Sequence, residues 1–183
     1  PGCTAYVIGD SGLMNALYDA GIVFTDTNPE YVIIGETRNY GYDSLRKAIN
    51  LVADGAKLIG TNPDISGPSE TGIVPGCKAL VAPIEMVTRK TAYYIGKPNP
   101  LMMRTGMRLL GVRPEECVII GDRMDTDIVA GIESEIDTVL VLSGVTDLIN
   151  IKSFPYRPKT ILNNVGEIVS RADGDAGIYP DNQ

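Results

Sequence analysis

The stretch that decides the fold is Ile119–Asp127, which reads IIGDRMDTD. Cys117 and Val118 precede it, so residues 117–120 form a fully apolar run that is followed by Gly121. A run of this kind predicts a parallel β-strand that is covered on both faces. The strand delivers the carboxylate of Asp122 to its carboxyl end, which is where open α/β sheets bind ligands.

Three carboxylates follow this strand, and their surroundings favour different roles. Magnesium takes hard oxygen ligands and keeps several waters, so one or two carboxylates are enough to hold it. We expect Asp122 to be the metal ligand, because a carboxylate directly after a buried strand has no helix to cap. Asp127 lies where the next helix begins and is placed to orient the metal's waters or a neighbouring group. The alternative for Asp125 and Asp127 is capping of that helix, and we favour it for Asp125.

A second polar motif, Gly96–Pro100, reads GKPNP and follows a strand predicted over residues 93–95. Prolines at the start of a helix place Lys97 beside backbone N–H groups that suit anions. Lys97 could neutralise a transferring phosphoryl group and its acid partner; the alternative is a solvated lysine in a turn. One predicted helix separates Lys97 from Asp122, so in a right-handed unit both turns open at the same edge of the sheet.

Short apolar runs alternate with amphipathic stretches along the whole chain, which predicts a parallel sheet with covering helices. We expect strands at residues 5–8, 22–24, 31–34, 57–59, 93–95, 117–120, 138–142 and 160–162, and helices at 13–19, 44–53, 79–87 and 100–110. Residues 65–76 are rich in Gly, Ser and Pro and predict a loop. In the last helix, Met103, Met107 and Leu110 are expected to face inward.

Composition excludes several classes of function. The net charge of −7 argues against nucleic-acid binding, and no apolar run is long enough to cross a membrane. The absence of histidine excludes Ser-His-Asp and Cys-His catalysis. The three cysteines (Cys3, Cys77 and Cys117) form neither a disulfide framework nor a zinc motif, and we interpret them as buried small hydrophobes. Their sparse use favours a reducing compartment such as the cytoplasm.

The segment Thr61–Asp64, which reads TNPD, also follows an apolar strand. Asn and Asp around a proline most often form a plain turn. The functional alternative is a polar rim that contacts substrate.

Taken together, these motifs resemble a known superfamily. Gly96–Pro98 and Gly121–Asp127 are similar to the third and fourth motifs of the haloacid-dehalogenase superfamily. The stretches 32–38 (VIIGETR), 61–64 (TNPD) and 142–145 (LSGV) resemble its NagD and p-nitrophenyl phosphatase branch. The similarity covers nearly all of residues 4–170.

The resemblance implies a two-part α/β chain. Residues 1–92 would be an α/β cap domain of the C2 type, and residues 93–183 would be the C-terminal half of a Rossmann-like core with a parallel sheet. The implied site consists of Lys97 and Asp127 as catalytic residues, Asp122 as the Mg2+ ligand, and Thr61, Asn62 and Asp64 as substrate-binding residues. The substrate would be a small-molecule phosphate ester, such as a nucleotide, sugar or cofactor phosphate.

Enzymes of this superfamily begin with an Asp-x-Asp segment that supplies the nucleophile and the general acid. No Asp-x-Asp follows a leading strand here; Asp125 and Asp127 have that spacing but lie inside the fourth motif. We therefore expect the N-terminal part of the enzyme to be missing and this chain to be inactive alone. The parent would act through an aspartyl-phosphate. We also expect the strand at 117–120 to present an open edge, to be covered by the missing segment, another chain or a homo-oligomer.

Two other classes of protein remain as alternatives. One is a non-catalytic module that binds a metabolite or a protein partner. The other is a receiver-like signalling domain, which also uses strand-end aspartates and a lysine. The receiver order is different, because its lysine follows the phospho-acceptor, whereas Lys97 precedes Asp122.

Overall fold

The computed structural model describes residues 2–168, and the chain divides into two compact units, Pro1–Gly96 and Lys97–Gln183. The predicted α/β class with parallel sheets is confirmed in both units. The division falls after Gly96 rather than after residue 92. The reason is that β7 (Tyr93–Tyr94) pairs with β4 (Lys57–Gly60) of the first unit instead of opening the second.

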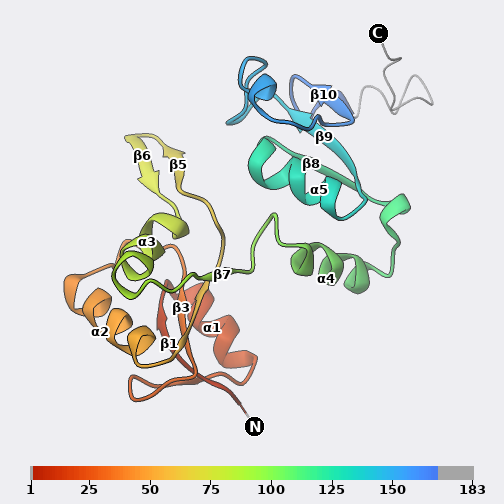
Figure 1. The fold of residues 1–183 in the computed structure, drawn as a ribbon. Helices are drawn as coiled ribbons and strands as arrows, with labels where there is room; N and C mark the ends of the chain where they lie inside the picture. The colour runs from red at the N-terminus through yellow and green to blue at the C-terminus, as the bar shows by residue number, and fades with distance from the viewer. Residues whose placement is uncertain (1, 169–183) are drawn as a thin grey trace. The chain divides into compact units, whose positions relative to one another are not determined.

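The first unit is built on a five-stranded parallel sheet in the order β2-β1-β3-β4-β7 (Figure 1). Its remaining elements are β1 (Thr4–Ile8), α1 (Ser11–Asp19), β2 (Val23–Phe24), β3 (Tyr31–Ile34), α2 (Tyr42–Ala53) and α3 (Cys77–Thr88). The connection through α1 runs across the sheet in the opposite direction to those through α2 and α3. Right-handed crossovers therefore place α1 on one face and the other two helices on the opposite face.

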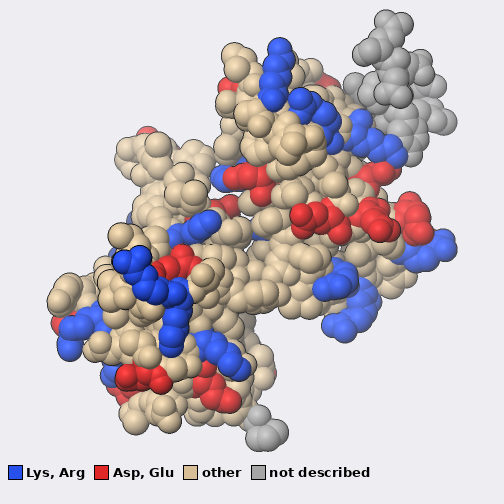
Figure 2. All heavy atoms as spheres, viewed as in Figure 1, with Lys and Arg blue, Asp and Glu red and all other residues tan. Residues whose placement is uncertain are grey.

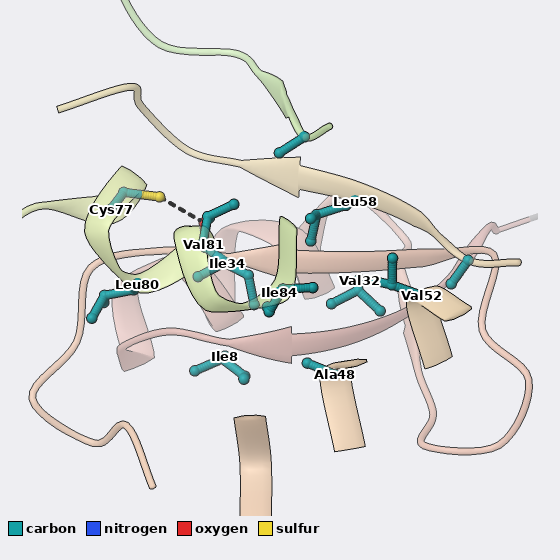
Figure 3. Packing of buried hydrophobic residues seen from close by; sticks show 12 residues of the cluster. Ile8, Val32, Ile34, Ala48, Val52, Leu58, Cys77, Leu80, Val81 and Ile84 are labelled. Atoms are coloured by element: carbon teal, nitrogen blue, oxygen red, sulfur yellow. Dashed lines mark hydrogen bonds between the residues drawn. The ribbon is translucent and has the colours of Figure 1, made fainter. Parts of the chain in front are cut away.

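The core of the first unit lies between the sheet and the α2 and α3 helices. Its fully buried side chains include Val32 and Ile34 from β3, Val52 from α2, and Val81 and Ile84 from α3 (Figure 3). Each such side chain contributes about 1.5–3 kcal/mol on burial. The Sγ of Cys77 donates to the carbonyl of Ile34 at 3.2 Å, so this cysteine is buried as predicted. Cys3 and Cys117, in contrast, are only partly buried.

The predicted loop over residues 65–76 is wrong, because it contains a two-stranded antiparallel hairpin (Figure 1). Its strands are β5 (Ser66–Ser69) and β6 (Gly72–Pro75). Gly72 takes a positive φ of 126° at the turn, which favours glycine. Sequence periodicity missed the hairpin because β5 has no apolar side chain apart from proline and buries none of its residues.

The second unit contains a three-stranded parallel sheet in the order β10-β9-β8. Its elements are α4 (Pro100–Leu110), the 3-10 turn η1 (Pro114–Glu116), β8 (Val118–Gly121), the π-helical turn η2 (Met124–Ile128), α5 (Val129–Glu133), β9 (Asp137–Val141), the 3-10 turn η3 (Asn150–Ser153) and β10 (Thr160–Leu162). Met124, Ile128, Leu140 and Ile151 form a buried cluster on one face of this sheet.

Strand β8 lies at the edge of this sheet in the described part of the chain, as predicted. The prediction that both its faces are covered is wrong: Val118 is 50% exposed and Ile120 is 40% exposed. Within residues 2–168, the face of β8 that carries Ile119 is the one with a helix against it, since Ile119 packs at Gly131 of α5. The predicted inward face of α4 is only partly formed: Met103 and Met107 are partly buried, but α4 fully buries no residue and Leu110 is 75% exposed.

The charged residues are mixed over the surface. On the face drawn in Figure 2, lysine and arginine side chains are interspersed with acidic ones on both units. No helix between residues 2 and 168 has the length and the apolar character needed to cross a membrane.

Candidate active site

Asp122 directly follows β8, at the carboxyl end of the three-stranded sheet. Its Oδ2 accepts a hydrogen bond from the backbone N–H of Val145 at 2.8 Å. Its backbone carbonyl accepts from the N–H of Thr146 at 3.0 Å. Residues 145 and 146 come from the loop after β9, so the ends of two neighbouring strands meet at this carboxylate, which is partly exposed.

Asp127 lies in η2, is 3% exposed, and uses both oxygens. Its Oδ2 accepts from the backbone N–H groups of Asp122 at 3.2 Å and Arg123 at 3.1 Å. Its Oδ1 lies 2.6 Å from the Nζ of Lys97. A buried carboxylate needs such partners, because burial without them costs a large desolvation energy. A Cβ on Gly121 would lie 2.2 Å from this carboxyl carbon, which explains the glycine before Asp122.

The structure thus brings three of the predicted residues together in the second unit. Lys97 contacts Asp127, and Asp127 holds the backbone of Asp122. The Lys97 side chain remains 44% exposed, so its ammonium is accessible to a ligand while Asp127 is buried. Charge-assisted bonds of this kind fix both groups in place.

The capping role predicted for Asp125 is wrong, because its side chain forms an ion pair instead. Its carboxylate pairs with the guanidinium of Arg123, at 3.1 Å from Nε and 2.8 Å from Nη2. The side chain of Asp125 is about half exposed. Asp125 is thus held by Arg123, whereas Lys97 is held by Asp127.

Thr61, Asn62 and Asp64 lie in the first unit, after β4. The Oδ1 of Asn62 accepts from the backbone N–H of Asp64 at 3.1 Å, which is the plain-turn geometry. Its Nδ2 donates to Oε1 of Glu36 at 3.2 Å, and the same Glu36 oxygen accepts from the backbone N–H of Cys77 at 3.3 Å. This network ties the turn to the first residue of α3.

The resemblance implies Mg2+, and the donors near Asp122 test that expectation. Both Asp127 oxygens are occupied by N–H groups or by Lys97, so Asp127 does not fit as a direct ligand. Within residues 2–168, no hydrogen bond reaches Oδ1 of Asp122, and this oxygen fits a hard cation. No group of three or more Asp, Glu, His or Cys side chains among those residues is arranged to hold a metal ion. The residues present therefore fit Mg2+ as one carboxylate ligand, with waters or oxygens from elsewhere completing the shell.

Sequence reasoning quoted Gly144 and Val145 as part of the stretch 142–145 but assigned no role in the site to them or to Thr146. Gly144, Val145 and Thr146 surround Asp122, but they act through backbone N–H groups and through the space left by a missing side chain. Two signals were available: their place after a second buried strand, because parallel strands end at the same edge, and the resemblance of residues 142–145 to the NagD branch. Glu36 in the first unit was also missed as a bridging residue.

Comparison with known proteins agrees with this geometry. The family model described as HAD-hydrolase-like matches residues 94–168. The chain is 46% identical over 184 residues to dihydroxyacetone phosphatase of Corynebacterium glutamicum (strain R), covering 98% of this chain and 67% of that protein. It is 46% identical over 167 residues to ribonucleotide monophosphatase NagD of Escherichia coli (strain K12), covering 91% of this chain and 66% of that one.

Solved structures show the same relationship. NagD from E. coli superposes with a TM-score of 0.83 at 44% identity, covering 91% of this chain and 66% of that one. A 4-nitrophenylphosphatase from Thermotoga maritima superposes with a TM-score of 0.87 at 32% identity, covering 92% and 65%. The chain belongs to the haloacid-dehalogenase superfamily of hydrolases, in its NagD and p-nitrophenyl phosphatase branch. It spans about two thirds of the length of these relatives.

Proposed function

We propose that this chain is part of a Mg2+-dependent phosphatase that hydrolyses small phosphomonoesters through an aspartyl-phosphate. The observation that carries the proposal is the Lys97–Asp127 pair, whose acid also holds the backbone of Asp122. It joins a cation suited to a phosphoryl group and a carboxylate suited to a metal at one sheet edge.

Lys97, Asp127 and Asp122 then each have a defined task. The half-exposed ammonium of Lys97 neutralises charge on the phosphoryl oxygens during transfer. Asp127 positions that ammonium and stays out of direct contact with substrate. Oδ1 of Asp122 offers one ligand to Mg2+. When bound, the cation supplies Lewis-acid stabilisation of the phosphoryl oxygens.

The nucleophile belongs, in this proposal, to an Asp-x-Asp segment that precedes these residues in a longer protein. Its first carboxylate forms a bond to phosphorus as the ester P–O bond breaks, and the second protonates the departing alkoxide. Water then cleaves the acyl phosphate and releases inorganic phosphate. The 183-residue chain without that segment supplies no nucleophile for the phosphoryl group and, in this proposal, is inactive alone.

The first unit is assigned as the cap, with Thr61, Asn62 and Asp64 toward the substrate. Support comes from their place at the carboxyl end of β4 in a parallel sheet, where such folds bind ligands. The relatives are named for dihydroxyacetone phosphate, ribonucleotide and sugar phosphate chemistry. This favours a small phosphate ester as the substrate class. Three free cysteines favour the cytoplasm as the compartment.

The test uses the longer protein, in which the Asp-x-Asp segment is joined to this chain, with p-nitrophenyl phosphate as substrate. Asp122→Asn should lower kcat/KM by about 100-fold or more, because it weakens the metal ligand. Asp125→Asn is the matched control, since the half-exposed Asp125 carboxylate pairs with Arg123 rather than with Lys97 or the Asp122 backbone, and it should stay within about twofold. Equal activity of both variants, or turnover by the isolated 183-residue chain, contradicts the proposal.

A further inference from the structure

Three hydrogen bonds connect the loop after β9 to the loop after β8. The N–H of Val145 donates to Oδ2 of Asp122 at 2.8 Å, and the N–H of Thr146 donates to the Asp122 carbonyl at 3.0 Å. The N–H of Met124 donates to Oγ1 of Thr146 at 3.4 Å. Thr146 is therefore bonded to the Asp122 turn through both its backbone and its side chain.

Thr146 makes these bonds in a buried position. It is 6% exposed, and Met124 is 1% exposed. The carbonyl of Met124 accepts from the phenol of Tyr156 at 3.0 Å, so the turn is held from a second side as well. Loss of the Thr146 hydroxyl would leave the Met124 N–H without its acceptor in a buried setting, which carries a desolvation penalty.

Gly144 supplies the space for the carboxylate. A Cβ built on Gly144 would lie 2.1 Å from Oδ2 of Asp122 and 2.5 Å from its Cβ and carboxyl carbon. No real Cβ tolerates such distances, so the absence of a side chain at residue 144 allows Asp122 to approach the loop. The result is a carboxylate whose Oδ2 is bonded to the loop and whose Oδ1 accepts no hydrogen bond from residues 2–168, so that Oδ1 can bind another partner.

We propose that Thr146 is a positioning residue that holds Asp122 in the orientation required of a metal ligand. The inference rests on the proposed function, because it concerns the same carboxylate. Thr146 does not touch the reacting atoms; it fixes the turn so that the N–H of Val145 meets Oδ2. Groups that orient a metal ligand typically change metal affinity by 10- to 100-fold when they are removed.

The test compares Thr146→Val, Thr146→Ser and Thr138→Val in the 183-residue chain. Thr138 is a matched control: it is 3% exposed, and its Oγ1 accepts from the N–H of Lys159 at 2.9 Å, in the same unit but away from the Asp122 turn. Two NMR readouts are followed at the amide of Val145. One is its hydrogen-exchange rate, and the other is its line broadening on titration with Mn2+.

Thr146→Val should raise the exchange rate of the Val145 amide at least tenfold and weaken the Mn2+ effect about tenfold. Thr146→Ser should restore both, and Thr138→Val should change neither. If Thr146→Val does not fold, Thr146→Ala replaces it with the same expectations. Unchanged exchange in the hydroxyl-free variant, or an equal change in Thr138→Val, overturns the positioning role. A third outcome separates the two proposals: the exchange rates change as expected, but Mn2+ does not broaden the Val145 amide signal of the unsubstituted chain. That outcome supports the positioning role of Thr146 and contradicts the metal role of Asp122 in the proposed function.

Discussion

The Nζ of Lys97 lies 2.6 Å from Oδ1 of Asp127, a residue 30 positions further along the chain. The other Asp127 oxygen accepts from the backbone N–H groups of Asp122 and Arg123. One buried carboxylate thus couples the start of α4 to the end of β8. This coupling relates the position of the ammonium to that of the carboxylate proposed to bind metal.

Asp127→Asn should destabilise the second unit by about 1–3 kcal/mol. The amide can keep one oxygen acceptor, but its NH2 group would face either Lys97 or the two backbone N–H groups, leaving buried donors unpaired. Urea unfolding of the 183-residue chain measures the change. Asp125→Asn serves as the control on an exposed pair and should cost less than about 0.5 kcal/mol. Equal stability of both variants would show that the buried network contributes nothing.

Gly144→Ala should displace Asp122, because the added Cβ would lie 2.1 Å from its Oδ2. Overpacking of this kind costs about 1–3 kcal/mol, and the 2.8 Å bond to the Val145 N–H should be lost. Gly106→Ala is the matched control, since nothing lies within 4 Å of its Cβ position in the interior of α4. That change should stabilise the chain by about 0.5–1 kcal/mol. A crystal structure of Gly144→Ala with Asp122 unmoved would refute this explanation.

Stability should fall above pH 10, and Tyr156 should contribute to the fall. Burial, with smaller contributions from the charges of Asp125 and Glu133, raises the pKa of Tyr156 above its ordinary value of 10.0. A raised pKa in the folded state means that its stabilisation is complete below the unfolded pKa and is lost as the pH rises through the folded pKa. Burial also raises the pKa values of Tyr40 and Tyr94 in the first unit.

Tyr156→Phe should therefore flatten the decline in melting temperature above pH 10. It should also cost about 1 kcal/mol at neutral pH, because the hydrogen bond to the Met124 carbonyl is lost. Thermal unfolding between pH 7 and pH 11 tests both effects. Tyr18→Phe, at a position that is 72% exposed, controls for removal of a surface hydroxyl and should cost less than about 0.5 kcal/mol. A Tyr156→Phe curve parallel to that of the unsubstituted chain would exclude this contribution.

The open edge of β8 predicts self-association of the isolated chain. In the part of the chain that the structure describes, no strand pairs with the outer edge of β8. Its backbone groups and the partly exposed side chains of Val118 and Ile120 form a template for another strand. Ile120→Lys should shift the chain toward the monomer in sedimentation velocity, because lysine on an edge strand opposes pairing. Ile73→Lys, at a residue that is 83% exposed in the first unit, should have little effect. A clean monomer of the unsubstituted chain at every concentration would contradict the prediction.

Apolar periodicity was sufficient to predict most elements that have a buried face. The runs that became β3, β4 and β9 were placed correctly because their side chains enter a core. The β5–β6 hairpin has no buried residue and left no such pattern. The inward face expected for α4 failed at Leu110 for the opposite reason. Its apolar spacing is present, but nothing in the described chain covers Leu109 and Leu110.

In the site, the residues that act through charged side chains were predicted, and those that act through the backbone were not. Lys97, Asp122 and Asp127 were predicted because their charges follow predicted strands, and the structure brings them together. Val145 and Thr146 were assigned no role in the site, because the hydrogen bonds to Asp122 come from backbone N–H groups, which every residue except proline has. The type of residue at a position therefore carries little information about such contacts.

The most direct measurement is Mg2+-dependent turnover of p-nitrophenyl phosphate by Lys97→Ala in the longer protein. Removal of a preorganised charge at a phosphoryl group typically costs 100- to 1,000-fold, so kcat/KM should fall by about that factor. Lys152→Ala removes an exposed lysine of the same unit and should remain within about twofold. Turnover by Lys97→Ala equal to that of Lys152→Ala would contradict a phosphatase site built on Lys97, Asp122 and Asp127.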